Sequence, residues 1–313
     1  MRVLLTNDDG VRSAGIQAIR AALTRVCTSV VTVAPDGERS GFARKCTFDR
    51  PVGIRRLEGG PHPVFECDGT PTDCVRAGLL GGLAAETDLV VSGINHGANL
   101  ADDVVYSGTV GAGLEAAVLG TSALCLSQQT PTGSLSVNYT EHPGPGGSGY
   151  DFGLAARHGA QAAAAFLRAR PDETVVLSVN YPADPAGAGT QNGPTAVLTR
   201  PGQRVYPRAP VRDWDADPSP QALYLFGEPD ETIPEADGPA DTDVAALRRG
   251  LISVTPLSVA IGLDEFSPAM TSFLGQLAVR AQCPPPQCPP PQSSPPHDSA
   301  EQDSAQQRPE HQA

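Results

Sequence analysis

The sequence predicts an α/β fold of three layers, in which helices cover both faces of a mostly parallel β-sheet. The first observation is a series of short, unbroken apolar runs bounded by turn residues, which is typical of parallel strands buried on both faces. The second is that stretches with apolar residues at helical spacing lie between these runs. Strands that alternate with helices build strand-helix-strand units, so the expected arrangement is Rossmann-like.

The chain opens with one such unit. Residues 3–5 form the first predicted strand, residues 16–26 carry apolar side chains every three or four positions and predict a helix, and residues 30–34 form the second strand. Further strands are predicted at 89–92, 123–127 and 174–179, and further helices at 110–119 and 160–168. Gly, Pro, Ser and Thr are enriched between residues 130 and 149, which predicts a long surface loop and a candidate lid.

The pattern changes after residue 200, so we expect residues 1–200 to form the α/β core. Residues 201–263 carry proline-broken strands around an acidic loop, which predicts a projecting hairpin and a return strand. Two strands alone are marginally stable in water, so we expect the hairpin to be exchanged between subunits. Residues 264–281 predict a C-terminal helix. The Pro-, Gln- and Ser-rich tail at 282–313 is expected to be disordered, either as a polyproline ligand or as a segment without a selected role.

Composition limits the possible partners. The chain has 313 residues, of which 40% are hydrophobic, enough for a large core. A net charge of -13 repels a nucleic acid polymer, whereas a small phosphate ester can bind where a metal ion or a helix N-terminus outweighs that charge. No apolar stretch reaches the roughly 20 residues needed to cross a membrane, so we expect a cytoplasmic protein without membrane contact. Five of the 7 cysteines are scattered without paired metal-ligand spacing and are expected to be reduced thiols: Cys27, Cys46, Cys67, Cys74 and Cys125. Cys283 and Cys288, in the tail, match no established zinc pattern and are expected to be incidental.

Polar side chains follow three of the predicted strands. Asp8 and Asp9 come directly after the first strand, Ser40 lies after the second, and Asn95 follows the strand at 89–92. Because the carboxyl ends of parallel strands meet at one edge of the sheet, these four oxygen ligands could converge on one divalent cation. An oxygen-only set favours Mg²⁺ or Mn²⁺ over Zn²⁺. On its own, the local sequence Asn-Asp-Asp-Gly also suits a solvated turn.

A candidate phosphate-binding segment precedes the predicted helix at 110–119. Ser107 and Thr109 lie where a helix N-terminus presents unpaired amides, which bind anions. Thr109 equally suits the ordinary role of an N-cap. His96 is either an acid or base for the reaction or a loop histidine that is solvated or hydrogen-bonded.

Two other loops leave alternatives open. Residues 69–75 either shape a base pocket or form a turn and a helix start, with Thr72 as the cap. Asp102 or Asp103 is expected to cap a turn. The first strand is not followed by G-x-G-x-x-G, and a P-loop is absent, which argues against a dinucleotide-binding fold or a P-loop enzyme. An aspartyl nucleophile would need one free carboxylate, so metal-activated water fits two metal-binding aspartates better.

The motifs occur together in one order along the chain. They are Asn7-Asp8-Asp9-Gly10, Ala34-Pro35-Asp36 with Ser40-Gly41, Gly69-Thr70-Pro71-Thr72-Asp73-Cys74-Val75, Ser92-Gly93-Ile94-Asn95, Tyr106-Ser107-Gly108-Thr109-Val110, Val179-Asn180-Tyr181-Pro182 and Val254-Thr255-Pro256-Leu257. In these motifs the chain resembles the SurE survival-protein family of metal-dependent 5′/3′-nucleotidases, known as acid phosphatase SurE. The resemblance extends from residue 1 to about residue 263 and leaves out the proline-rich tail.

The resemblance implies a SurE-like fold and a phosphomonoesterase that hydrolyses nucleoside 5′- and 3′-monophosphates with one divalent metal ion per subunit. It also implies a homodimer or homotetramer that exchanges a C-terminal hairpin. The residues that match the family's metal ligands are Asp8, Asp9, Ser40 and Asn95, and those that match its phosphate-binding segment are Ser107, Gly108 and Thr109, with Asn99 nearby. Either Asp8 or Asp9 would orient the attacking water. The alternative function is a nucleotide-binding or scaffolding protein that does not hydrolyse its ligand.

Two positions depart from the family pattern. Ala101 stands where the family usually has glycine, so we expect an altered backbone at a position of positive φ. Residues 258–266 lack the polar side chains found near the C-terminus of many members, which leaves a dimer and a tetramer open.

Overall fold

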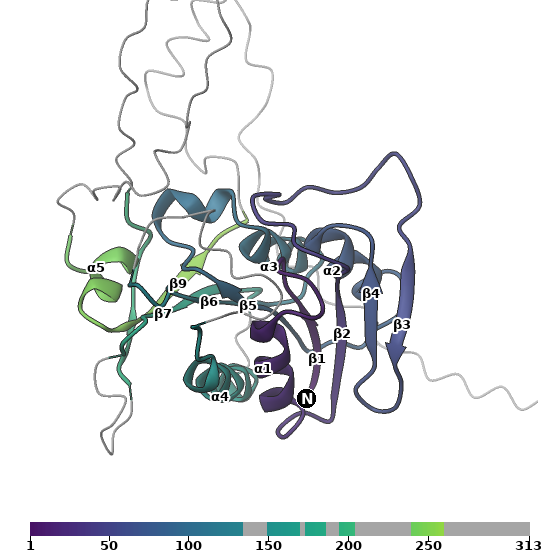
Figure 1. Cartoon of the computed structure of the whole chain (residues 1–313), viewed down its shortest axis with the longest axis horizontal. Helices are drawn as coiled ribbons and strands as arrows, with labels where there is room; N and C mark the ends of the chain where they lie inside the picture. Colours follow the sequence, from purple (N-terminus) through teal and green to yellow (C-terminus); the bar gives the residue numbers. More distant parts are fainter. Residues whose placement is uncertain (134–148, 170–172, 186–193, 204–238, 260–313) are drawn as a thin grey trace, which may run out of the picture. The chain divides into compact units, whose positions relative to one another are not determined.

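The structure is a computed structural model that describes residues 1–133, 149–169, 173–185, 194–203 and 239–259. Figure 1 shows the elements along the chain. The strands are β1 (Arg2–Thr6), β2 (Ser29–Pro35), β3 (Ile54–Glu58), β4 (Val64–Cys67), β5 (Leu89–His96), β6 (Ala123–Gln128), β7 (Val176–Tyr181), β8 (Ala196–Leu198) and β9 (Ile252–Leu257). The helices are α1 (Ala14–Leu23), α2 (Pro71–Leu79), α3 (Gly108–Val118), α4 (Gly153–Ala169) and α5 (Asp243–Arg248), with a 3-10 helix, η1 (Ala101–Val105).

The strands form one sheet in the order β3-β4-β2-β1-β5-β6-β7-β9-β8. The stretch from β4 to β7 is parallel throughout, and the antiparallel pairs are β3 with β4 and β7 with β9. The mostly parallel sheet is therefore confirmed. The chain leaves β1 toward β2 on one side and later returns to β5 on the other. Ligand sites of open α/β sheets lie at such a reversal, outside the carboxyl ends of the strands.

Helices cover both faces of the sheet, which confirms the three layers. Figure 1 shows α1 and α4 on one face and α2 and α3 on the other. On the α1 side, Ile16 and Ile19 belong to a buried cluster with Leu126 of β6. On the α2 side, fully buried Leu4 of β1 packs with Cys74 and Val75. Burial of a leucine side chain of this kind contributes about 2 kcal/mol or more, so β1 is held firmly between the two layers.

The structure shows how residues 69–75 begin helix α2. Thr70 is the N-cap, its side chain accepts a hydrogen bond from the Asp73 amide, and the Asp73 side chain accepts from the Thr70 amide. Pro71 occupies the first helical position, where its missing N–H costs nothing. The segment is thus a helix start, as one interpretation held, but the predicted cap at Thr72 is wrong. Thr72 is fully buried inside the first turn, because the capping box selects Thr70.

Several element boundaries differ from the predicted ones. Helix α1 ends at Leu23 and not at residue 26, and Val26 is 53% exposed. Helix α4 begins at Gly153, seven residues before the predicted start at 160. Strand β5 continues past residue 92 to His96, after a register shift between Ser92 and Asn95. That extension places two of the candidate site residues on the strand itself.

The predicted return strand at 251–255 is β9, which pairs with β7 in the main sheet. The predicted hairpin strand at 223–226, most of the loop at 130–149, the helix at 264–281 and the tail at 282–313 lie outside the described residues. The extent of the hairpin and its use in oligomers stay predictions.

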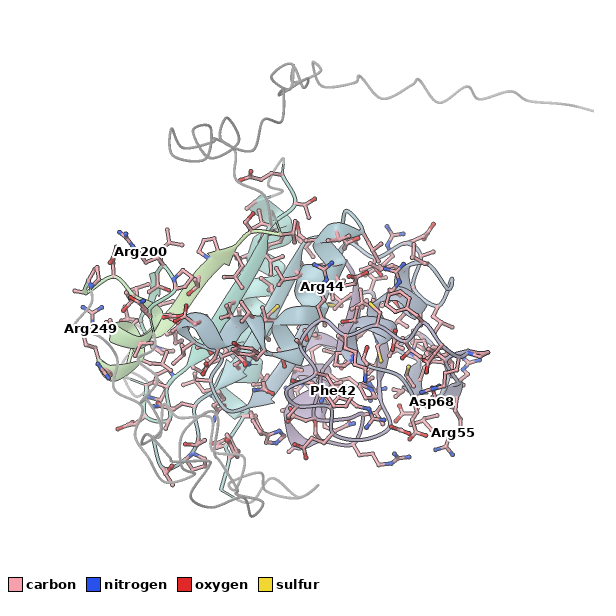
Figure 2. All side chains as sticks on the ribbon, turned by 90° about the horizontal axis from the view of Figure 1, so that it is seen from above. Phe42, Arg44, Arg55, Asp68, Arg200 and Arg249 are labelled. Atoms are coloured by element: carbon pink, nitrogen blue, oxygen red, sulfur yellow. The ribbon has the colours of Figure 1, made fainter. Side chains whose placement is uncertain are left out.

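Figure 2 shows how the two ends of the sheet are separated. Arg55 of β3 and the neighbouring Asp68 lie at one end, whereas Arg200 and Arg249 lie at the other. Among the described helices, none is long and apolar enough to span a bilayer. The five described cysteines are free thiols, as predicted: Cys27, Cys46, Cys67, Cys74 and Cys125.

Candidate active site

The polar residues predicted to form the site follow neighbouring strands. Strand β1 lies between β2 and β5, so the segments after these three strands meet at the carboxyl edge of the sheet. The main-chain N–H of Arg39 donates to the carbonyl of Asp8 at 2.7 Å, which brings the segment carrying Ser40 beside the end of β1. The structure therefore gathers the elements that carry the predicted ligands.

The carboxylate of Asp8 is buried, with a relative exposure of 3% for the residue. Its Oδ1 accepts a hydrogen bond from the Thr109 hydroxyl. Burial, followed by the charge of Asp9, raises the pKa of Asp8 to about 7, and the hydrogen bonds from Thr109 oppose that rise only in part. An aspartate in this environment gains from a nearby cation, because the cation compensates for both the lost hydration and the neighbouring charge.

Asp9 has a different environment. Its Oδ1 lies 3.0 Å from Nδ1 of His96, and both side chains are only 7% exposed. The second oxygen, Oδ2, is buried and has no hydrogen-bond partner within the described part of the chain. A buried carboxylate oxygen without a partner is costly, so this atom is a candidate metal ligand.

Asn7 supports the turn that carries both aspartates. Its Nδ2 donates to the carbonyl of Gly10 at 3.0 Å and to Oγ of Ser13 at 2.8 Å. Gly10 has a φ of +97°, and a Cβ there would lie 3.1 Å from the backbone of Gly37. The motif therefore forms a tight turn and is also a candidate site. Asn7 and Gly10 shape the backbone, whereas Asp8 and Asp9 contact Thr109 and His96.

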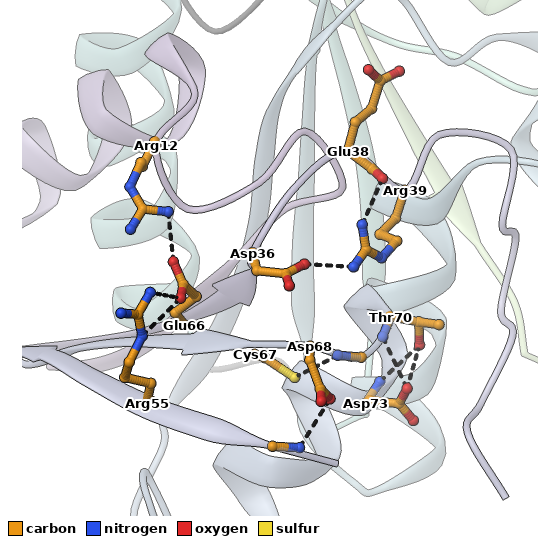
Figure 3. Close-up of polar contacts among 12 residues, drawn as sticks. Arg12, Asp36, Glu38, Arg39, Arg55, Glu66, Cys67, Asp68, Thr70 and Asp73 are labelled. Atoms are coloured by element: carbon orange, nitrogen blue, oxygen red, sulfur yellow. Dashed lines mark hydrogen bonds and ion pairs between the residues drawn. The ribbon is translucent and has the colours of Figure 1, made fainter. Parts of the chain in front are cut away.

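Figure 3 shows ion pairs in the segment after β2 and on the neighbouring strand β4. Arg39 pairs with Asp36 at 2.5 Å, and Glu66 accepts from both Arg12, at 2.5 Å, and Arg55. The amide of Asp36 also donates to the carbonyl of Cys67, which ties the segment to β4. The contacts of Asp36 and Arg39 hold the backbone that leads to Ser40.

Strand β5 and the loop after it carry the two candidate asparagines. Nδ2 of Asn95 donates to the carbonyl of Gly97 at 2.9 Å, which leaves its Oδ1 as the atom able to bind a cation. Asn99 exchanges hydrogen bonds with Asn180: its amide donates to Oδ1 of Asn180, and Nδ2 of Asn180 donates to its carbonyl. Nδ2 of Asn99 donates to Oγ of Ser127. Asn99 is therefore anchored to the ends of β6 and β7.

The N-terminus of α3 corrects the interpretation of Thr109 as a cap. The N-cap is Ser107, whose Oγ accepts from the amide of Val110 at 3.1 Å. Thr109 is the second helical residue and directs its hydroxyl to Asp8. The cap preference is satisfied by Ser107, and this leaves Thr109 available to bind the carboxylate. The helix N-terminus lies against the candidate metal ligand, where it favours an anion such as phosphate.

Gly108 is required by this close approach. A Cβ on Gly108 would lie 2.9 Å from both Cβ and Oδ2 of Asp8. Any larger residue would therefore push the carboxylate away from its place or push the start of α3 off the sheet.

We expect Gly108→Ala to lower kcat/KM by about 100-fold, the usual order of loss for a displacement near 1 Å in an active site. Phosphate release under saturating metal measures it. Gly37→Ala is the matched control and should leave activity nearly unchanged, because the contact of a Cβ there with the described residues is an ordinary one, to Arg39 Nη1 at 3.6 Å. Equal activity of the two variants would show that Asp8 tolerates displacement.

The loop before α3 keeps a left-handed backbone without glycine. Ala101 has a φ of 52°, so the expected alteration of the positive φ at this position does not occur. Its amide donates to Oδ2 of Asp243 at 2.9 Å, and Oδ1 of Asp243 accepts from the amides of Gly202 and Val244. This buried carboxylate from α5 holds the loop in place. The N-cap of η1 is Leu100, and its side chain makes no capping hydrogen bond. The turn cap expected from Asp102 or Asp103 stays a prediction.

The residues present fit a hard divalent cation. In the described residues there is no group of three or more His, Cys, Asp or Glu side chains that could hold a metal. The predicted set does not belong to that type, because it combines two carboxylates with a hydroxyl and an amide. The unpartnered Oδ2 of Asp9 and the raised pKa of Asp8 both indicate a site that lacks positive charge.

Comparison with known proteins identifies the family. The family model described as survival protein SurE matches residues 3–208. The chain belongs to the SurE family. The 5′-nucleotidase SurE of Xanthomonas campestris pv. campestris (strain B100) is 38% identical over 285 residues, which cover 91% of this chain and 100% of that protein. The 5′-nucleotidase SurE of Geobacter sulfurreducens is 40% identical over 258 residues, or 82% and 87% of the two chains.

A solved structure agrees with the fold. The crystal structure of the SurE protein from Aquifex aeolicus superposes with a TM-score of 0.66 at 29% sequence identity, covering 88% of this chain and 100% of that one. The predicted SurE resemblance and the α/β fold are both confirmed.

Proposed function

We propose that this SurE-family chain is a metal-dependent phosphomonoesterase that hydrolyses nucleoside 5′-monophosphates, and also 3′-monophosphates, to nucleoside and phosphate. The observation that carries the proposal is the buried pair Asp8 and Asp9 at the carboxyl edge of the sheet, beside the N-terminus of α3. The curated relatives named 5′-nucleotidase SurE support it. They also disfavour a nucleotide-binding protein without hydrolysis.

Asp8, Asp9, Ser40 and Asn95 would hold the ion, one per subunit. Their all-oxygen chemistry favours Mg²⁺ or Mn²⁺. When bound, a divalent ion would offset the charge of the two aspartates and of the phosphate and would lower the pKa of a water molecule for attack on phosphorus. We assign the orientation of that water to Asp8 or Asp9.

The chain's own groups would bind the phosphate. Ser107, Gly108 and Thr109 start α3, and the amides of this first turn favour negative charge that grows on the phosphoryl oxygens. Asn99 lies in the neighbouring loop, fixed by Asn180 and Ser127, and would contact the phosphate from that side. Thr109 has a second task, since its hydroxyl holds Asp8.

We expect phosphate release from a panel of nucleoside monophosphates when Mn²⁺ or Mg²⁺ is present, and none after a chelator is added. The reason is that both aspartates need a cation to act on an anionic substrate. Colorimetric phosphate measurement on folded protein tests this. Release that a chelator leaves unchanged would argue against the metal, and no release with any metal would argue against hydrolysis.

The oligomer is a further proposal. We propose a homodimer or homotetramer formed through the segment at 201–263, because β9 joins the core sheet while the predicted hairpin would need cover from another subunit. A cytoplasmic location is proposed together with it. Light scattering of the full chain and of a chain with a shortened hairpin would measure the subunit number.

A further inference from the structure

His96 makes a buried contact that the proposed reaction does not yet use. Its Nδ1 lies 3.0 Å from Oδ1 of Asp9, and both side chains are 7% exposed. A carboxylate oxygen can only accept, so the imidazole N–H must be on Nδ1. We propose that His96 is a positioning residue for the metal site: it fixes the Asp9 carboxylate through Oδ1 and thereby leaves Oδ2 to the divalent ion. The inference rests on the proposed function.

Aromatic side chains hold the imidazole ring in place. Tyr150 and Phe152, the aromatic clamp, precede α4 and stack on each other, with ring centroids 5.2 Å apart and planes at 5°. The His96 ring meets both in edge-to-face geometry, with centroids 5.1 Å from Tyr150 and 5.0 Å from Phe152. Edge-to-face contacts favour one ring orientation. The clamp therefore restricts the direction in which Nδ1 points.

Within the described residues, the polar contact of the ring is with Asp9. Nε2 of His96 is buried and has no hydrogen-bond partner among the residues described. A histidine that served only to stabilise the fold would be expected to use both nitrogens, because a buried nitrogen without a partner is costly. The one contact that is made falls on a candidate metal ligand.

The complementary observation lies on Asp9. Oδ2 of Asp9 is buried and also has no partner in the described ranges. If His96 and Asp9 formed an ordinary buried pair, further donors would be expected on that oxygen. His96 thus holds Oδ1 of Asp9, and Oδ2 is left open. This is the arrangement in which a hydrogen bond from outside the metal site orients a metal-binding carboxylate. Loss of such outer-shell partners typically costs 10- to 100-fold in metal affinity.

The test compares three substitutions at His96 in the full-length chain. His96→Ala removes the N–H. His96→Asn places an amide N–H at the same bond distance from the backbone as Nδ1, whereas His96→Gln places it where Nε2 was. We expect the Kd for Mn²⁺, measured by calorimetry without substrate, to rise about 10- to 100-fold in the Ala and Gln variants and to recover in part in the Asn variant.

Activity gives a second measurement that a structural role would not produce. If His96 acts through the metal, the Ala variant should lose phosphate release at limiting Mn²⁺ and regain most of kcat at saturating Mn²⁺. Thermal unfolding in chelator should show similar stability for the wild type and the Asn variant, so that their Mn²⁺ affinities can be compared even if the Ala variant folds poorly.

The outcomes are distinct. A wild-type chain that binds no Mn²⁺ would overturn the proposed metal site and this inference with it. A wild type that binds Mn²⁺, with Ala and Gln variants of equal affinity, would overturn only the role of His96. Weakened binding in all three variants alike would also count against it, because the position of the N–H would then not matter.

Discussion

Asp8→Asn should reduce phosphate release by at least about 1,000-fold, which corresponds to roughly 4 kcal/mol of transition-state stabilisation. The substitution removes one of the two negative charges proposed to hold the ion, and metal-ion stabilisation of a phosphoryl transition state is worth several kcal/mol. The fold should survive, because an asparagine of the same shape can still accept a hydrogen bond from Thr109. Steady-state phosphate release with Mg²⁺ and with Mn²⁺ measures the loss.

Asp88→Asn is the matched control. Asp88 binds the main chain and side chain of Arg2, at the start of β1, while Asp8 lies beyond its end. The control loses a surface ion pair and should remain within a few-fold of wild-type activity. Circular dichroism should show the same folded content in both variants. Near-normal activity of the Asp8 variant in the presence of metal would mean that the metal assignment is wrong.

The fold was largely predictable because its central strands are short apolar runs. β1, β2 and β6 are buried on both faces, and a short, nearly continuous apolar run is typical of such a strand. Strand β3 was missed because every residue in it is exposed and it carries two arginines at the edge of the sheet. Strand β8 was missed because it has only three residues, too few for a pattern.

The site was predictable where ligands follow strand ends, and it was not where distant segments meet. Asp243 holds the loop at Ala101 across 142 positions of sequence, and Asn180 holds Asn99 across 81. Neither position carries a local signal for that contact, although Asn180 lies in a motif shared with the family. For His96 the sequence left open a chemical role and a solvated or hydrogen-bonded one, because the surroundings of its ring depend on Tyr150 and Phe152 from a separate segment.

The contribution of Asp8 to the stability of the metal-free protein should fall as the pH rises from about 4 to 7. Burial and the charge of Asp9 raise the pKa of Asp8 to about 7, from an ordinary value of 3.8. The folded state thus binds this proton more tightly than the unfolded state does. The contribution of Asp8 is complete below pH 3.8 and is lost as the pH rises through 7, by up to about 4 kcal/mol.

Other groups change stability over the same range, so the measurement is a difference. Hydrogen bonds and ion pairs lower the pKa of Asp68 and Asp88, which makes their contributions grow as the pH rises through the acidic range, opposite in sign to that of Asp8. The free energy of unfolding of the wild type and of Asp8→Asn is measured with denaturant in chelator at several pH values between 5 and 8. In the difference between the two proteins, the contributions of the groups that they share cancel. The free energy of unfolding of the variant should increase relative to that of the wild type as the pH rises.

Adding Mn²⁺ should reverse that gain. The ion binds the ionised carboxylates of the folded wild type, so it should stabilise the protein strongly at pH 8 and little at pH 5, where protons compete for Asp8. The variant, with one ligand charge removed, should respond weakly at both. Parallel unfolding curves for the two proteins across this pH range would show that Asp8 titrates normally, and the need for a cation beside it would then rest on the unpartnered oxygen of Asp9 alone.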